Sequence, residues 1–264
     1  MSSDLATAAP VRQSRPSWRL LSARTTAVTA RRVLTQLVRD RRTVAMILVV
    51  PSVLMVLLRY VFDDQLVFDR IAPALLGVFP FVMMFLLTSV AMLRERTSGT
   101  LERLLTTPMA KADLLLGYGI AFAIAATAQA SVACATAYWL LDLTTAGPVW
   151  LLLVVAVADA ILGMALGLWA SAFAKTEFQA VQFMPAIVLP QVLLCGLLTP
   201  REAMAGWLEA ISNVLPMSYA VDALNEVKSN PEVTAALVGD LAVVVGATVA
   251  ALALGAATLR RRTA

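Results

Sequence analysis

A short polar segment interrupts two long apolar blocks and decides how the rest of the chain can fold. It reads Arg94-Glu95-Arg96-Thr97-Ser98-Gly99-Thr100-Leu101-Glu102-Arg103-Leu104-Leu105-Thr106-Thr107-Pro108. Ser98 or Thr100 can cap a helix and Pro108 stops one, so the segment predicts a small helix with a charged face and an apolar face. It is either a solvated connector with a capped turn, or a helix across the cytoplasmic mouth of a membrane protein that offers its charged face to another protein.

The composition of the chain excludes a soluble domain of this size. Of its 264 residues, 60% are hydrophobic and 14% are charged. Uncharged runs near or above roughly 20 residues, the length that crosses a bilayer as a helix, recur along the sequence. We therefore expect an all-α membrane protein. Its net charge of +4 comes from basic residues at the ends of apolar runs, a distribution that does not form a nucleic-acid groove.

Six membrane spans are predicted, at residues 44–62, 71–93, 114–141, 149–174, 181–198 and 233–259. The outer segments of this topology hold only four of the 21 basic residues: Arg59, Arg70, Arg201 and Lys228. Because basic residues collect on the cytoplasmic side, both termini and residues 94–108 are expected inside the cell. Arginine outnumbers lysine and alanine is abundant, as in proteins from GC-rich bacteria, so we expect a multi-pass protein of a bacterial inner membrane.

The chain divides into three predicted parts. Residues 1–16 are expected to form a disordered cytoplasmic tail. Residues 17–42 predict an amphipathic helix that lies in the inner membrane interface, with arginines opposite an apolar face. That face consists of Leu20, Ala23, Ala27, Ala30, Leu34, Leu37 and Val38. The arginines attract anionic lipid, a role compatible with contact to a second protein. Residues 43–264 form the six-span domain.

Two further patterns predict local structure. Residues 199–231 are too polar and interrupted to cross the bilayer, but their apolar residues recur at helical spacing, which favours two short re-entrant helices at the outer leaflet. Gly163 and Gly167 form a GxxxG pattern in the fourth span, which predicts close contact with another helix. That helix lies either within the same bundle or in a second copy of the chain.

The sequence argues against several kinds of chemistry. Histidine is absent, which removes the commonest general base and most zinc sites. Cys134 and Cys195 lie inside apolar runs, where free thiols are expected. The sequence has no phosphate-binding GxxxxGK[ST] loop, so another chain would have to bind any nucleotide, and we expect no cofactor in this one. An intramembrane enzyme would need an unusual Ser-Lys or lone-Asp mechanism.

Asp159 lies near the middle of the fourth span, where an ionised carboxylate is costly. It could belong to a proton relay or contact a substrate, and in a stand-alone proton-coupled carrier it would be the coupling site. It could also be a protonated or hydrogen-bonded acid that faces Ser, Thr or a partner helix. The second interpretation is favoured because no second carboxylate or lysine lies at similar depth.

Two stretches resemble type-2 ATP-binding-cassette (ABC) exporter permeases, in the branch that contains daunorubicin-resistance-like drug exporters. The signature loop is resembled by Arg94-Glu95-Arg96, Gly99-Thr100-Leu101-Glu102 and Thr107-Pro108. The late outward loop of the family is resembled by Pro185, Gly196-Leu197-Leu198, Trp207-Leu208 and Leu215-Pro216-Met217-Ser218-Tyr219-Ala220-Val221-Asp222-Ala223-Leu224. Members often carry a proline just before the position of Trp207, where this chain has Ala205-Gly206.

The resemblance implies a transport subunit with no enzyme activity of its own, which exports an amphipathic drug-like or lipid-like molecule. Two ABC ATPase subunits, which bind ATP and magnesium, would dock on its inner face, and a second permease, identical or closely related, would pair with it. The N-terminal helix would also touch an ATPase. The residues expected to couple ATP hydrolysis to transport are Arg94, Glu95, Thr100, Leu101, Glu102 and Arg103. The residues expected to line the substrate path, if they do not simply pack or face lipid, are Phe79, Met83, Gln182 and Phe183.

Overall fold

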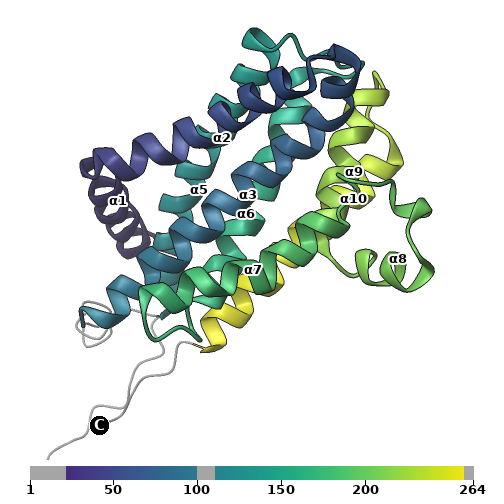
Figure 1. Ribbon diagram of the computed structural model, residues 1–264. Helices are drawn as coiled ribbons and strands as arrows, with labels where there is room; N and C mark the ends of the chain where they lie inside the picture. The colour runs from purple at the N-terminus through teal and green to yellow at the C-terminus, as the bar shows by residue number, and fades with distance from the viewer. Residues whose placement is uncertain (1–21, 100–110, 259–264) are drawn as a thin grey trace, which may run out of the picture.

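The computed structural model describes residues 22–99 and 111–258, and every regular element in those two ranges is helical. The α-helices are α1 (Ala23–Arg39), α2 (Arg41–Phe62), α3 (Gln65–Thr97), α5 (Lys111–Ala135), α6 (Val149–Ala170), α7 (Glu177–Leu194), α8 (Gly206–Ser212), α9 (Pro216–Ser229) and α10 (Ala235–Thr258). A π-helical turn, η1 (Thr136–Leu140), extends α5, and a 3-10 turn, η2 (Arg201–Ala203), follows α7. The predicted all-α class is confirmed (Figure 1).

Six of these helices are long and apolar enough to cross a membrane: α2, α3, α5 with η1, α6, α7 and α10. The predicted number of spans is therefore confirmed within the described residues, but some ends differ. The second span is a 33-residue helix because Asp64 caps its start through the amide of Leu66, at a distance of 2.8 Å. The fifth span ends at Leu194, because the chain then turns through Gly196 with a positive φ of 93°.

The centre of the bundle is the contact between α3 and α6. A Cβ added to Gly163 would lie 2.4 Å from the carbonyl oxygen of Phe81, and one added to Gly167 would lie 2.5 Å from that of Phe85. Only glycine allows two helix backbones to approach this closely. The GxxxG pattern therefore packs within the bundle, and its glycine face does not meet a second copy of the chain.

Burial divides the spans into an inner and an outer set. In α3 and α6, 61% and 67% of the most apolar window is buried, whereas in α2 and α7 only 17% is buried. Helix α10 is similarly exposed. In Figure 1, α3 lies between α2 and α7. The exposed apolar surfaces of α2 and α7 are thus left for lipid or for another protein.

Two short helices, α8 and α9, stand between α7 and α10, and the predicted pair of helices is therefore present. They differ in burial: Trp207 on α8 is exposed, whereas Met217, Val221 and Leu224 on α9 are buried. Helix α9 packs against α3, α6 and α10. The placement of these helices at the outer leaflet stays a prediction.

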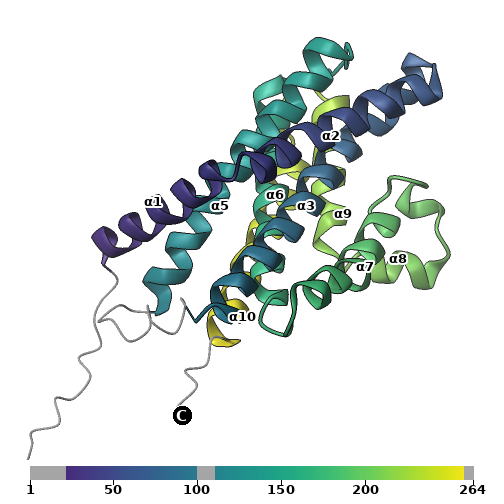
Figure 2. The same ribbon diagram turned by 60° about the vertical axis from the view of Figure 1, so that its left-hand side comes forward.

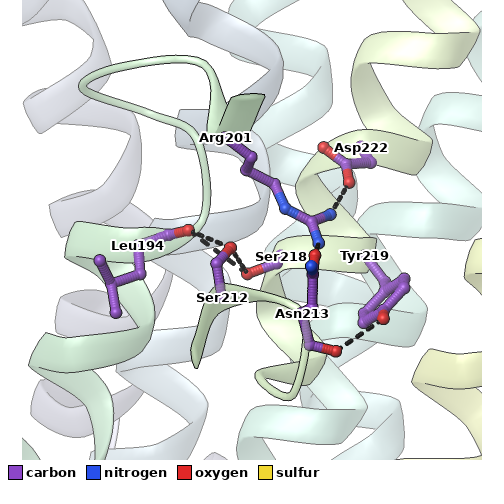
Figure 3. A network of polar contacts seen from close by, with 7 residues as sticks. All are labelled: Leu194, Arg201, Ser212, Asn213, Ser218, Tyr219 and Asp222. Atoms are coloured by element: carbon purple, nitrogen blue, oxygen red, sulfur yellow. Dashed lines mark hydrogen bonds and ion pairs between the residues drawn. The ribbon is translucent and has the colours of Figure 1, made fainter. Parts of the chain in front are cut away.

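Arg201 joins η2 to α8 and α9 (Figure 3). Its guanidinium donates hydrogen bonds to the carboxylate of Asp222 and to the side-chain oxygen of Asn213. The same group lies 5.2 Å from the ring centroid of Tyr219, whose hydroxyl donates to the Asn213 carbonyl at 2.7 Å. Ser212 donates to the carbonyl of Leu194, 2.7 Å away. The shape of this segment is thus set by polar contacts and needs no proline before Trp207.

We expect Gly167→Ala to lower the thermal unfolding temperature of the purified chain, because its Cβ would lie 2.2 Å from the Thr88 hydroxyl oxygen. Overpacking of this kind costs about 1–3 kcal/mol. Gly246→Ala on α10 is the matched control, because nothing lies within 4 Å of its Cβ position. Equal unfolding temperatures for the two variants would contradict the close contact of α6 with α3.

Candidate functional site at the loop end of the bundle

The predicted N-terminal helix corresponds to α1, which is separate from the first span. Residues 17–21 lie outside the described part, and α1 ends at Arg39. Asp40 then caps α2, where its carboxylate accepts hydrogen bonds from the amide of Thr43 at 3.1 Å and from the Thr43 hydroxyl at 2.6 Å. These two bonds lower the pKa of Asp40. The chain can therefore change direction between α1 and α2.

The buried face of α1 packs on α5 and overlaps the predicted apolar face only in part. Thr26, Thr29, Ala30 and Val33 are buried, whereas Ala27 and Val38 of the predicted apolar face are exposed. Gly117 of α5 allows the contact, because a Cβ there would lie 2.6 Å from the Cβ of Thr29. The exposed part of the predicted apolar face is left open to lipid, so the position of α1 in the membrane interface stays a prediction. Small side chains face α5, so the buried face is displaced around the helix axis from the predicted apolar face.

Arg32 brings α1, α3 and α5 together at the loop end, the end of the bundle where α3 ends and α5 begins. Its guanidinium donates a hydrogen bond of 2.6 Å to the hydroxyl of Tyr118 on α5. It also lies 3.6 Å from Glu95 Oε1 on α3. The second carboxylate oxygen of Glu95 is buried and has no hydrogen-bond partner among the described residues. Burial limits solvent screening, which strengthens the attraction between the two charges.

Both flanks of residues 100–110 are held to α1. Glu95 lies before this segment and contacts Arg32. Asp113 lies after it, at the start of α5, and accepts hydrogen bonds from the amide of Ser22 at 2.9 Å and from the hydroxyl of Thr26 at 3.4 Å. A displacement of the segment would therefore act on α1 from two sides.

Arg94 connects the same end of α3 to α7. Its Nε and Nη2 atoms donate to the two carboxylate oxygens of Glu177, at 2.7 and 2.9 Å. Arg96 donates to the carbonyl of Ser171, which follows α6. Ser98 ends α3, and its amide donates to the Arg94 carbonyl at 2.9 Å. Arg94 and Glu95 thus belong to the last turns of the second span.

The other predicted coupling residues, Thr100, Leu101, Glu102 and Arg103, lie outside the described residues, as does the predicted helix that contains them. The contacts that the sequence did not reveal are those of Arg32, Asp113, Tyr118 and Glu177. Their signals were present but weak: a tyrosine and an acid in a span of mostly apolar residues, and an acid at the start of the fifth span. Sequence spacing does not show which of these side chains meet, because their partners are distant in the chain.

The four residues predicted to line the substrate path do not line one common groove. Met83 lines a groove of about 460 Å³ between α1, α2, α3 and α5. Phe79 packs against the buried core. Gln182 is exposed on α7, while Phe183 packs with Leu93. Because a helix rises 1.5 Å per residue, Leu93 lies about 15 Å along α3 from Met83. A role in a substrate path stays a prediction for these residues.

Asp159 is fully buried in α6. One carboxylate oxygen lies 3.0 Å from the position of a Cβ on Gly77 of α3, and Leu224 of α9 lies equally close to that position. Neither carboxylate oxygen has a hydrogen-bond partner among the described residues, so a hydrogen-bonded acid is not what the structure shows. The side-chain amide of Gln129 on α5 also lacks a partner there. Buried polar groups without partners are costly and call for an explanation.

Residues 94–108 thus connect two of six spans, and the described residues on both flanks, Glu95 and Asp113, contact α1. A family model described as ABC-2 type transporter matches residues 24–227. The chain belongs to this family. The match includes nearly all of α1, the loop end and most of α9, so it covers Arg32, Glu95 and Asp113 but not Ser22. It confirms the resemblance seen in the charged segment.

Relatives of this ABC-2 chain have names that concern transport or resistance. It is 28% identical over 142 residues to the probable multidrug ABC transporter permease YbhR of Escherichia coli (strain K12), covering 54% of this chain and 39% of the relative. It is 23% identical over 139 residues to the linearmycin resistance permease protein LnrN of Bacillus subtilis (strain 168), covering 53% and 36%. It is 26% identical over 141 residues to ABC transporter G family member 20 of Dictyostelium discoideum, covering 53% and 19%. The matches span about two fifths or less of each relative.

We expect Gly117→Ala to displace α1 from α5 and to lower the unfolding temperature, because the new Cβ would overlap the side chain of Thr29. Gly119→Ala is the matched control two residues away, because nothing lies within 4 Å of its Cβ position. Since alanine favours helix over glycine by about 1 kcal/mol, the control should be neutral or stabilising. If both variants unfold at the wild-type temperature, α1 does not pack on α5 as described.

Proposed function

We propose that this chain is the membrane subunit of an ABC exporter that moves an amphipathic drug-like or lipid-like molecule out of the cell, using ATP hydrolysed by separate ATPase subunits. Membership of the ABC-2 family and the six spans support the class. The observation that carries the coupling role is the attachment of both flanks of residues 100–110 to α1, through Glu95 and Asp113. ATP and magnesium would be bound by the partner chain.

Coupling would work as a rigid-body displacement of packed helices. An ATPase subunit docked on residues 100–110 would move the end of α3, the start of α5 and α1 together. The Arg94–Glu177 pair would pass part of that movement to α7. Charged groups at the docking surface, including Glu102 and Arg103, would fix register more than affinity.

Pairing with a second permease, identical or closely related, would use the exposed faces of α2 and α7. These two helices are the least buried spans, and they flank α3. The groove lined by Met83 opens between α1, α2, α3 and α5, next to that face. An amphipathic molecule would then move between the two copies, past Phe79, Met83, Gln182 and Phe183. We place the complex in a bacterial inner membrane with both termini in the cytoplasm.

The names of the relatives support an amphipathic drug-like substrate. YbhR is named as a probable multidrug permease, and LnrN as a linearmycin resistance permease. The groove beside Met83 is mostly apolar but has Asp40, Arg94 and Glu95 among its lining residues. An apolar surface with a few charged groups suits an amphipathic molecule.

A stand-alone proton-coupled carrier is the second candidate, and Asp159 is the observation that favours it. A fully buried carboxyl group without a partner is a candidate coupling site. Vesicles that contain the chain without any ATPase separate the two functions. Transport driven by a proton gradient alone would favour the carrier, and transport only with ATPase and ATP would favour the exporter.

We expect Glu95→Gln to leave membrane insertion intact but to reduce ATP-driven transport about fivefold, because the variant loses the ion pair with Arg32. A fivefold loss corresponds to about 1 kcal/mol, the upper range for a partly exposed pair. The assay is transport by the permease reconstituted with its ATPase. Glu232→Gln, an exposed acid before α10, is the control. Unchanged ATP-driven transport in Glu95→Gln would show that the contact with Arg32 takes no part in coupling.

We expect Glu102→Arg to insert normally and to uncouple ATP hydrolysis from transport, because it reverses a charge on the proposed docking surface. ATPase stimulation and export should be measured on the same vesicles. If both stay at the wild-type level, residue 102 takes no part in coupling.

A further inference from the structure

Arg31 borders two hollows whose lining residues differ in chemistry. The first is a groove of about 630 Å³ between α1 and α5. Its α1 wall includes Ala27 and Leu34, and its α5 wall consists of Leu116, Ile120 and Ile124. Each of the three α5 side chains is nearly half exposed, and they recur every fourth residue along one helical face. The groove therefore forms a continuous apolar track, with Arg31 at its edge.

The second hollow is lined by residues of α1 alone, and all of them except Val28 carry polar or charged groups. It measures about 420 Å³, and its lining includes Arg31, Arg32 and Arg39 with Thr35 and Gln36. Arg31 lines both hollows. An apolar track and an arginine-lined hollow are thus joined at one side chain.

The electrostatics of α1 favour an anion in the second hollow. The helix carries four arginines and no acidic residue between Ala23 and Arg39. Arg32 pairs with Glu95, but no carboxylate in the described part of the chain lies within ion-pair distance of Arg31 or Arg39. Their charges add in the hollow. Arginine also binds phosphate through two parallel hydrogen bonds.

The apolar groove lies on the flank of α1 that faces away from α3. On the opposite flank, Val33, Gln36 and Leu37 line the separate groove that includes Met83 of α3. In Figure 2, α1 lies across the lower part of α5, on the side of the bundle opposite α7. A second permease placed over α2 and α7 would therefore leave the apolar groove open to the bilayer.

We propose that the two hollows together bind one anionic phospholipid. Its acyl chain would lie along Leu116, Ile120 and Ile124, and its phosphate would be bound by Arg31 and Arg39. Burial of the chain in the groove supplies the apolar part of the affinity. The positive hollow selects a lipid with net negative charge over a zwitterionic lipid. An acidic protein segment would match the arginines but would leave the apolar groove without an occupant.

A lipid in this position would brace α1 against α5, beside the contact at Gly117. Arg31 is adjacent to Arg32, whose contacts with Tyr118 and Glu95 hold α1 to the bundle. The lipid would thereby stabilise the arrangement of helices at the loop end. Lipid binding requires neither the ATPase nor transport. This proposal can therefore fail while the exporter function holds, and the exporter function can fail while the lipid still binds.

The test is native mass spectrometry of the full chain in detergent, with phosphatidylglycerol and phosphatidylcholine of identical chains added in turn. We expect one phosphatidylglycerol to be retained about fivefold better than phosphatidylcholine, the preference that one well-placed arginine supplies. Arg31→Gln should reduce the preference, and Arg31→Gln combined with Arg39→Gln should abolish it. Arg24→Gln should retain it, because Arg24 lies on the same helix but lines neither hollow. Ile120→Trp should lower retention of both lipids by filling the groove.

Three results would overturn the proposal. The first is equal retention of the two lipids by the wild-type chain. The second is an equal loss in Arg31→Gln and Arg24→Gln, which would indicate diffuse attraction to a basic helix. The third is absence of bound lipid together with weaker ATPase binding by Arg31→Gln, which would make the arginine hollow a protein-docking surface. Arg31 is exposed, so its replacement should not prevent folding.

Discussion

The attachment of α1 to α3 and α5 is the interaction on which the loop end depends. Arg32 reaches Glu95 at the end of α3, Asp113 at the start of α5 accepts from Ser22 and Thr26, and Gly117 lets the backbones approach. Helix α3 extends this arrangement through the bundle, because its contact with α6 leaves no room for a side chain at Gly163. In the proposed coupling, a displacement of residues 100–110 would act on these packed helices together.

The polar contacts at the loop end differ in geometry and exposure. The side chains of Arg94 and Glu177 are 62% and 50% exposed, and an exposed pair contributes about 0–1 kcal/mol. Those of Arg32 and Glu95 are 31% and 14% exposed, so water screens their attraction less. The Arg94–Glu177 pair has the shorter, bidentate geometry, whereas the Arg32–Glu95 pair is longer but less exposed.

The sequence predicted the spans, which depend on the length of apolar runs. It missed the side-chain contacts between residues that are distant in the chain. Hydropathy located six spans because each must cover a bilayer, but the polar start of α3 after Asp64 carries no such signal. Helical periodicity located α1 and its apolar face, but it did not reveal that another face of the helix packs on Gly117 of α5. The GxxxG pattern predicted close packing and left its partner open. The contact of Arg32 with Tyr118 joins residues 86 positions apart, which no local pattern encodes.

In the proposed function, residues 94–108 face the cytoplasm and an ATPase subunit docks on them. The most direct measurement is labelling of Ser98→Cys with a membrane-impermeant maleimide, in intact cells and in inverted vesicles. Cys134 and Cys195 are buried and should stay unlabelled. We expect labelling only in inverted vesicles, with protection when the ATPase subunit is bound. Labelling in intact cells would place the segment outside and would contradict the proposed coupling.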